Sequence, residues 1–217
     1  MINMNIALTG SSGSIGSLLI NDLKKAGHKV LSISSSQSIQ DQNIFSYEEV
    51  MLGHTDTKAD LIIHLASANS SLDAFQIDEE VNLAKKVLKS MNALDCKKII
   101  FFSSIKVYGE NSSSDKLLTE ESLLEPKSSY GEAKMKSENF FIDMASVENF
   151  NYVILRLPPL LIDNPSSNIG KFFYFIRRGL PVPSFSKGNE NKKSFLTYEN
   201  LLASLELILD SKEKINN

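Results

Sequence analysis

The sequence is poor in the residues that build disulfides, metal centres and histidine-based catalytic triads. Cys96 is the only cysteine among 217 residues, which excludes an internal disulfide and a cysteine-based metal site. We expect it to be a small, partly buried residue rather than a nucleophile. The histidines, His28, His54 and His64, share no spacing that favours a zinc site or a Ser-His-Asp triad, so we expect no bound metal. His64 lies in an apolar run, where we expect a core residue bonded to the backbone.

An excess of one charge and long apolar runs are also lacking. The 23 basic and 26 acidic residues give a net charge of −3, which gives no sign of a nucleic-acid or membrane surface. No apolar run reaches the roughly 18–20 residues that a membrane span needs. The start of the chain leads into a predicted strand without the basic flank and cleavage site of a signal peptide. We therefore expect a cytoplasmic protein with no nucleic-acid or membrane partner.

Apolar segments alternate with helical patterns along the whole chain. The expected strands are residues 6–8, 30–33, 61–66, 99–102 and 152–156, and the expected helices are residues 14–26, 73–95 and 129–147. Strands that alternate with helices, and that are apolar almost throughout, predict a parallel sheet covered on both faces. The fold class is therefore α/β, with a Rossmann-type doubly wound sheet.

A glycine-rich stretch follows the first expected strand. It reads Ile6-Ala-Leu-Thr-Gly10-Ser-Ser-Gly13-Ser-Ile-Gly16 and leads into a helix. In a strand-turn-helix unit, Gly10 allows the tight turn and Gly13 allows a diphosphate to approach the backbone closely. Gly16 allows close packing of the helix on the strand. The helix N-terminus would then hold the phosphates. The alternative is a glycine-rich loop without a ligand.

The end of the second expected strand bears on the choice of dinucleotide. It reads Ser34-Ser35-Ser36-Gln37, with neither an acidic residue nor an arginine. An acidic residue would bind the ribose hydroxyls and repel a 2′-phosphate, whereas an arginine would bind that phosphate. The cofactor is thus NAD or NADP, and the missing acid slightly favours NADP.

Three polar side chains form a candidate catalytic set. Ser104 ends an expected strand at the carboxyl edge of the sheet, where open α/β folds bind ligands. Tyr130 and Lys134 are four residues apart on one face of an expected helix. A tyrosine needs a pKa shift of about three units to act as an acid/base near pH 7. We expect the neighbouring ammonium group, and a bound nicotinamide cation in one redox state, to lower its pKa. The alternative is that the pair belongs to an ordinary amphipathic helix.

Together these motifs resemble the extended short-chain dehydrogenase/reductases, in particular the NAD(P)-dependent nucleotide-sugar epimerases and dehydratases of the UDP-glucose 4-epimerase-like type. The matching segments are Thr9-Gly10-Ser-Ser-Gly13-Ser-Ile-Gly16, Asp60-Leu-Ile-Ile-His-Leu-Ala66-Ser67, Val81-Asn82, Ser103-Ser104-Ile-Lys-Val-Tyr108-Gly109, Tyr130-Gly-Glu-Ala-Lys134 and Leu155-Arg156-Leu-Pro158-Pro159.

The resemblance implies a role for each matching residue. Tyr130 is the expected acid/base, Lys134 its activator, and Ser104 the hydroxyl that orients the substrate. The expected cofactor-binding residues are Gly10, Ser12, Gly13, Ser14, Ile15, Gly16, Ser34, Ser35, Leu65, Ala66, Ser67, Asn82, Tyr130, Lys134 and Pro158. The expected substrate-binding residues are Arg177 and Lys193, whose charges suit a diphosphate.

The resemblance also implies an organisation. Residues 1–157 would form the NAD(P)-binding domain, and residues 158–217 a partial substrate-binding region, because family members continue beyond the position of Asn217. Residues 105 and 106 are Ile and Lys instead of the Asp-Glu pair of sugar dehydratases, which argues against dehydration. The helices at residues 73–95 and 129–147 imply a homodimer, to which Met135, Phe141 and Met144 would contribute unless they are core residues.

The leading functional expectation is a nucleotide-sugar 4-epimerase that forms a transient 4-keto sugar. Two alternatives stay open from the sequence. One is an NADPH-dependent 4-keto-sugar nucleotide reductase, and the other is a non-catalytic, dinucleotide-binding regulatory protein.

Overall fold

The structure is a computed structural model that describes residues 3–34, 44–67, 74–109, 118–162, 168–181 and 194–211. Within it, two compact units are separated after Arg156. The first unit contains the large sheet, and the second contains Leu157–Ser211. The loop residues 35–37 and Lys193, which the sequence analysis singled out, lie outside the described residues.

The first unit is built on a six-stranded sheet in the order β3-β2-β1-β4-β5-β6. The strands are β1 (Asn5–Thr9), β2 (Lys29–Ser34), β3 (Ile44–Ser46), β4 (Leu61–His64), β5 (Lys98–Ser104) and β6 (Asn151–Leu157). β1 pairs in parallel with β2 and β4, β2 with β3, and β4 with β5. The strand order reverses between β1 and β4, so the loops after these two strands flank the point where such sheets bind ligands.

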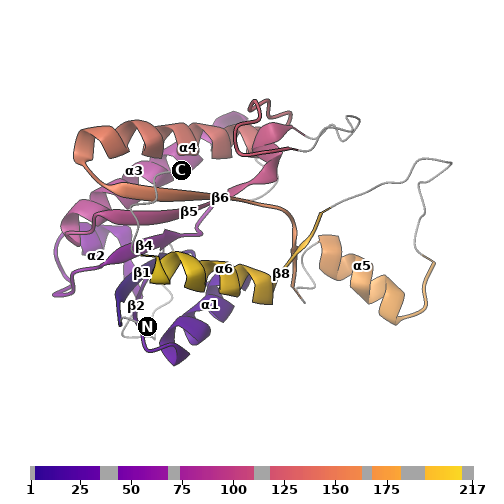
Figure 1. The fold of residues 1–217 in the computed structure, drawn as a ribbon, viewed down its shortest axis with the longest axis horizontal. Helices are drawn as coiled ribbons and strands as arrows, with labels where there is room; N and C mark the ends of the chain where they lie inside the picture. Colours follow the sequence, from indigo (N-terminus) through magenta and orange to yellow (C-terminus); the bar gives the residue numbers. More distant parts are fainter. Residues whose placement is uncertain are drawn as a thin grey trace. The chain divides into compact units, whose positions relative to one another are not determined.

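Helices cover both faces of this sheet. They are α1 (Ser14–Lys25), α2 (Tyr47–Met51), α3 (Ala74–Ala93) and α4 (Ser129–Glu148), with a short 3₁₀ helix, η1 (Ile105–Tyr108). α3 and α4 pack together on one side of the sheet, and α1 lies on the other (Figure 1). The predicted doubly wound α/β fold is confirmed.

Local sequence explains where several helices begin and end. Ser46 accepts a hydrogen bond from the Glu49 amide while the Glu49 carboxylate accepts one from the Ser46 amide, so this capping box starts α2. The Ser128 hydroxyl accepts from the Gly131 amide and starts α4. α4 ends at Asn149, which adopts the left-handed conformation that asparagine tolerates better than most residues.

The core lies between the sheet and the pair α3 and α4. It includes Ile62 and Phe101 from the strands and Val87 and Phe141 from the helices, none of them accessible to solvent. Phe141 is therefore a core residue rather than a dimer contact. Cys96 is also buried, more fully than predicted, and burial raises the pKa of its thiol to about 11.

The second unit is smaller. It contains β7 (Leu160–Leu161), α5 (Asn168–Arg177), β8 (Leu196–Thr197) and α6 (Tyr198–Asp210), and β7 pairs in parallel with β8. The Thr197 side chain caps α6, which buries Leu201 and Leu205. α5 exposes Tyr174, Phe175 and Ile176. No helix among the described residues is long and apolar enough to cross a membrane.

The structure adds elements that the sequence analysis did not identify: β3, α2, η1 and the elements of the second unit. β3, α2, η1, β7 and β8 are short, whereas the longer helices α5 and α6 do carry an apolar face that the sequence analysis overlooked. The predicted strand at residues 61–66 ends at His64, because the chain leaves the sheet where Leu65–Ser67 turn toward α3.

Candidate active site

The glycine-rich turn is held closely against the end of β4. Gly10 has a φ of +72°, which favours glycine, and a Cβ atom there would lie 2.6 Å from the Ala66 amide nitrogen. A Cβ atom on Gly16 would clash with the Gly10 carbonyl oxygen and lie 2.8 Å from the Ser11 Cα. These glycines therefore allow β1, the turn and the start of α1 to pack together.

Gly13 occupies the N-cap position of α1 and supplies no side-chain hydrogen bond to the first turn. The amide groups of the first turn of a helix have no partner within the helix, and they point along the helix axis toward the preceding loop. The turn therefore presents donors of the kind that bind phosphate groups, next to a positive helix end.

A cleft of about 840 Å³ opens over this turn. Its lining combines the turn, the ends of β2 and β4, and one side of α3: Gly10, Ser12, Gly13, Ser34, Leu65, Ala66, Ser67, Glu79, Glu80, Asn82, Leu83, Lys85, Lys86 and Lys89. The cleft thus brings together most of the predicted cofactor-binding residues of the first unit. Ser14, Ile15 and Gly16 do not line it but form the adjoining first turn of α1. Tyr130 and Lys134 do not line it either; Lys134 reaches its wall through the ion pair with Glu80.

The size and chemistry of this cleft fit a dinucleotide. Binding sites for small molecules and cofactors commonly occupy 300–1,000 Å³. The glycine turn leaves its backbone open to a diphosphate, while lysines and serines supply polar contacts around it. Among the described residues, no group of three or more His, Cys, Asp or Glu side chains is placed to hold a metal ion.

Tyr130 and Lys134 lie at the beginning of α4, next to η1. Gly131 permits this approach, because a Cβ atom there would lie 2.6 Å from the Lys106 carbonyl oxygen. The Lys106 ammonium lies 5.6 Å from the centre of the Tyr130 ring, and the Lys134 ammonium lies 5.9 Å from it. Ser104 ends β5 and caps η1, and its hydroxyl accepts a hydrogen bond from the Lys106 amide. The candidate catalytic residues thus sit on two elements that contact each other.

Lys134 is almost completely buried and has a buried partner that the sequence analysis missed. Its Nζ lies 3.0 Å from Oε1 of Glu80 on α3, and the two side chains are only 2% and 1% exposed. The Ser67 hydroxyl donates to the same Glu80 oxygen over 3.0 Å. The Lys134 ammonium also lies 4.9 Å from the centre of the Phe101 ring.

The predicted lowering of the Tyr130 pKa by the neighbouring ammonium group is wrong. Burial, and to a lesser extent the charge of Glu80, raises the pKa of Tyr130 to about 12. The prediction counted the Lys134 ammonium but neither the burial of the phenol nor the charge of Glu80. Burial also lowers the pKa of Lys134, an effect that Glu80 and Glu138 oppose.

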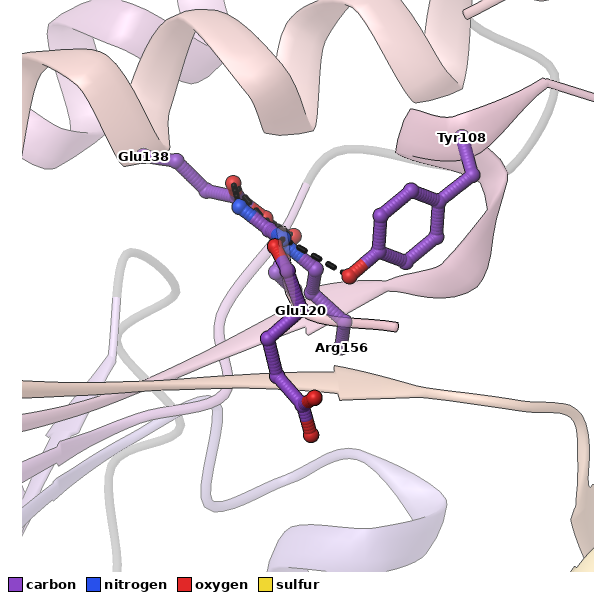
Figure 2. Close-up of polar contacts among 5 residues, drawn as sticks. Tyr108, Glu120, Glu138 and Arg156 are labelled. Atoms are coloured by element: carbon purple, nitrogen blue, oxygen red, sulfur yellow. Dashed lines mark hydrogen bonds and ion pairs between the residues drawn. The ribbon is translucent and has the colours of Figure 1, made fainter. Parts of the chain in front are cut away.

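A second buried carboxylate, Glu138, lies one turn after Lys134 on α4. Arg156 from β6 donates to both of its oxygens, with Nη2 2.8 Å from Oε2. Figure 2 shows that Arg156 lies between Glu138 and Tyr108, and its Nη1 donates to the Tyr108 hydroxyl over 2.7 Å. The Ser103 hydroxyl donates to Glu138 from β5. Because residues far apart in the sequence form this network, no local pattern identifies it.

His64 is buried, but its partner differs from the prediction. Its Nδ1 lies 2.7 Å from Oγ1 of Thr9, a side chain on the neighbouring strand rather than a backbone group. The ring stacks on Phe101 at 5.3 Å. Burial, and the charge of Lys134 in second place, holds the pKa of His64 well below its usual value, so it is a neutral core residue.

The remaining predicted residues lie in the second unit or outside the described residues. Pro158 follows β6 and is partly buried, and Arg177 ends α5 and is exposed. Ser35 and Lys193 are outside the described residues. Whether Pro158 contacts cofactor, or Arg177 substrate, stays a prediction.

The structure combines a doubly wound α/β fold, a glycine turn beside a cleft whose size fits a dinucleotide, and a tyrosine–lysine pair at the start of α4. The sequence model of the NAD dependent epimerase/dehydratase family matches residues 6–215. The chain belongs to this family, and it is an enzyme of the extended short-chain dehydrogenase/reductase type.

Individual relatives agree with this assignment. The chain is 24% identical to UDP-glucose 4-epimerase of Vibrio cholerae, over 98% of this chain and 68% of that protein. Its fold is similar to UDP-N-acetylglucosamine 4-epimerase from Bacillus cereus, with a TM-score of 0.80, 21% identity, and coverage of 99% of this chain and 76% of that one. UDP-glucuronic acid 4-epimerase from B. cereus, solved with UDP-glucuronic acid and NAD, has a TM-score of 0.77 and 21% identity, with coverage of 99% and 76%. The chain spans between 28% and 68% of the length of the curated relatives that it matches.

Proposed function

We propose that this chain acts as an NAD(P)-dependent nucleotide-sugar 4-epimerase whose substrate is a UDP-sugar. The observation that carries the proposal is the placement of Tyr130 and Lys134 beside a cleft that fits a dinucleotide. The family assignment and the epimerase activities of the similar proteins support it.

In this proposal the residues of the chain bind and move a proton. Tyr130 accepts the proton of the sugar 4-hydroxyl and later returns it, while Ser104 donates a hydrogen bond to the same sugar oxygen. Lys134 supplies positive charge beside the phenol and binds the nicotinamide ribose. Bound NAD(P) would supply the acceptor for the hydride of the sugar carbon and the donor that returns it, and the positive charge of its oxidised ring would favour the phenolate.

The glycine turn and the cleft residues would hold the cofactor. Gly13 and the first turn of α1 would bind the diphosphate, and Ala66 and Ser67 would border the dinucleotide. The similar protein solved with NAD supports NAD. At the end of β2, the cleft is lined by Ser34 and not by an acidic residue, and Lys85 and Lys86 line the same cleft. Both features support NADP. Titration of NADH and NADPH into stripped protein distinguishes the two, and a lower Kd for NADPH would confirm the prediction made from the sequence.

The test of the proposed function is epimerisation of UDP-glucose and of UDP-N-acetylglucosamine in the presence of NAD, followed by chromatography of the products. We expect conversion to the C4 epimer without net change in NADH absorbance. Tyr130→Phe is the matched variant, because it removes only the reacting hydroxyl. We expect it to lower kcat by about 10²–10⁴-fold while the Kd for NAD changes little.

The same experiment addresses the alternatives left open by the sequence. Net oxidation of NADPH with a 4-keto-sugar nucleotide would identify a reductase. A regulatory protein would be identified if wild-type protein and Tyr130→Phe both bind NAD or NADP and neither converts either substrate. Either result would contradict the epimerase proposal.

The organisation of the functional protein also stays a proposal. We assign residues 1–157 to cofactor binding and catalysis, and residues 158–217 to substrate binding through Arg177 and Lys193. The homodimer, with Met135 and Met144 at its interface, and the cytoplasmic location stay predictions. Light scattering after size exclusion tests the dimer, and a monomer at all concentrations would contradict it.

A further inference from the structure

Glu80 is a buried ionisable group that the proposed reaction does not use, and it lies next to the candidate catalytic residues. It lies on α3, at the wall of the cleft, and its side chain is 1% exposed. Its Oε1 is 3.0 Å from the Lys134 ammonium and accepts a hydrogen bond from Ser67. A carboxylate this deeply buried requires paired charge and hydrogen bonds, and both come from residues beside the candidate active site.

We propose that Glu80 is a positioning residue: its carboxylate anchors the Lys134 ammonium beside Tyr130 and keeps that ammonium charged, so that Glu80 sets the pH range in which the tyrosine–lysine pair operates. The effect of Glu80 on catalysis rests on the proposed function, whereas its effect on the Lys134 ammonium does not.

The contacts of Lys134 show why an anchor is required. Its ammonium lies over the Phe101 ring at 4.9 Å and near the Tyr130 ring at 5.9 Å, on an almost fully buried side chain. A lysine chain is flexible and its ammonium is strongly hydrated in water, so an apolar site favours the neutral amine. Glu80 supplies the directly contacting charge that opposes this preference.

The other charged groups around the pair come from different elements. Glu138 on α4 also stabilises the charged form of Lys134, but its carboxylate is engaged by Arg156 of β6. His64 on β4 is neutral. Lys106 on η1 lies over the Tyr130 ring. Of the carboxylates that act on Lys134, Glu80 is the one in ion-pair contact with it.

Loss of the Glu80 charge lowers the pKa of both Lys134 and Tyr130. Glu80 raises the pKa of Lys134, and it also raises the pKa of Tyr130. In Glu80→Gln both protonation equilibria therefore move toward lower pH. If Tyr130 must be deprotonated and Lys134 protonated, both limbs of a bell-shaped activity profile move in the same direction.

The direct test is an NMR titration of the full chain with ¹³C-labelled lysine, without any ligand. The Lys134 signal is assigned by its absence in Lys134→Gln. In Glu80→Gln we expect the midpoint of Lys134 to fall by about one pH unit or more, a tenfold change in its protonation equilibrium. Asp78→Asn is the matched control, because it removes an exposed carboxylate from the same helix, and we expect no shift.

Glu80→Asp keeps the test decisive if Glu80→Gln does not fold. It retains the carboxylate but shortens the side chain by one methylene group, which moves the charge away from Lys134. We therefore expect the Lys134 midpoint to fall as in Glu80→Gln, but by a smaller amount. A Lys134 midpoint within about 0.3 pH unit of wild type in the folded variants would overturn the proposal.

A second measurement separates this inference from the proposed function. In the UDP-glucose epimerisation assay we expect the pH optimum of Glu80→Gln to move to lower pH, whereas that of Asp78→Asn does not. A purely structural role would lower the amount of folded enzyme without moving the optimum, and that result would overturn the proposal. If the wild type does not epimerise the sugar, the proposed function fails while the NMR titration still decides the role of Glu80.

Discussion

Two buried carboxylates lie on the paired helices α3 and α4, and each accepts a hydrogen bond from one serine and pairs with one cation. Glu80 has Ser67 and Lys134, whereas Glu138 has Ser103 and Arg156. The arrangement is similar, but the cations differ.

The difference in cation separates two roles. Arg156 presents a planar fork that binds both oxygens of Glu138 and also reaches the Tyr108 hydroxyl and the Glu120 carbonyl, so it ties β6 to α4 and η1 (Figure 2). Lys134 makes one contact with Glu80 and offers a compact charge with rotatable donors. A fixed fork suits a structural connection, whereas a rotatable ammonium suits a site where a ligand must also be bound.

The largest expected effect comes from breaking the structural pair. Arg156→Leu leaves Glu138, which is 0% exposed, without its cation, and we expect a loss of about 3–5 kcal/mol in the free energy of unfolding. Urea denaturation measures it. Lys58→Ala, which breaks an exposed pair with Asp95, is the control and should leave the midpoint unchanged. A denaturation midpoint as little changed in Arg156→Leu as in Lys58→Ala would contradict the structural role of Arg156.

A smaller effect follows when the charge is kept but the fork is lost. Arg156→Lys retains attraction to Glu138 but cannot bind both oxygens and Tyr108 together, so we expect a loss of about 1.5–3 kcal/mol. The same urea experiment measures it. Stability equal to that of wild type would show that the fork geometry contributes nothing beyond its charge.

His64, whose pKa is affected by Lys134, makes the free energy of unfolding depend on pH. Its folded pKa lies well below the usual value of 6.5, so folding favours the neutral ring. The stabilisation is present above about pH 6.5 and is lost as the pH falls below it, with a slope of about 1.4 kcal/mol per pH unit. Unfolding at pH 7.0, 6.0 and 5.5 measures the slope in wild type, in His64→Gln and in the exposed control His54→Gln. We expect only His64→Gln to flatten it, and an equal slope in all three proteins would refute the prediction.

The smallest expected effects come from the two serines. Ser103→Ala removes a buried donor to Glu138, and we expect a loss of about 1–2 kcal/mol. Ser67→Ala should cost less, because Ser67 is exposed and water can replace its hydroxyl. Thermal and urea unfolding of both variants test this order. The reverse order would mean that the Glu80 site, not the Glu138 site, is the more tightly packed of the two.

The local parts of the candidate site were predictable from the sequence. Glycines 10, 13 and 16 between an apolar strand and a helix predict the turn, because a tight turn and close packing require residues without side chains. Tyr130 and Lys134 share a helix face at a spacing of four residues. The alternation of strands and helices predicts the sheet, although β3, α2 and η1 are too short to give a periodic signal.

The partners of the buried charges were not predictable in this way. Glu80 and Glu138 both lie in helices with mixed polar and apolar residues, where a carboxylate ordinarily faces solvent. The packing of α3 on α4 buries Glu80 against Lys134, and the position of β6 brings Arg156 to Glu138. The direction of the Tyr130 pKa was predicted wrongly because the prediction included the lysine but neither the burial of the phenol, which is the larger cause, nor the charge of Glu80.

The sequence by itself therefore determined the α/β class, the glycine turn and the tyrosine–lysine helix, because each depends on backbone preferences and spacing over a few residues. Only the tertiary structure decided which charges are paired, which groups are buried and in which direction the tyrosine pKa moves. Those properties depend on distance and desolvation between elements that are remote in the chain.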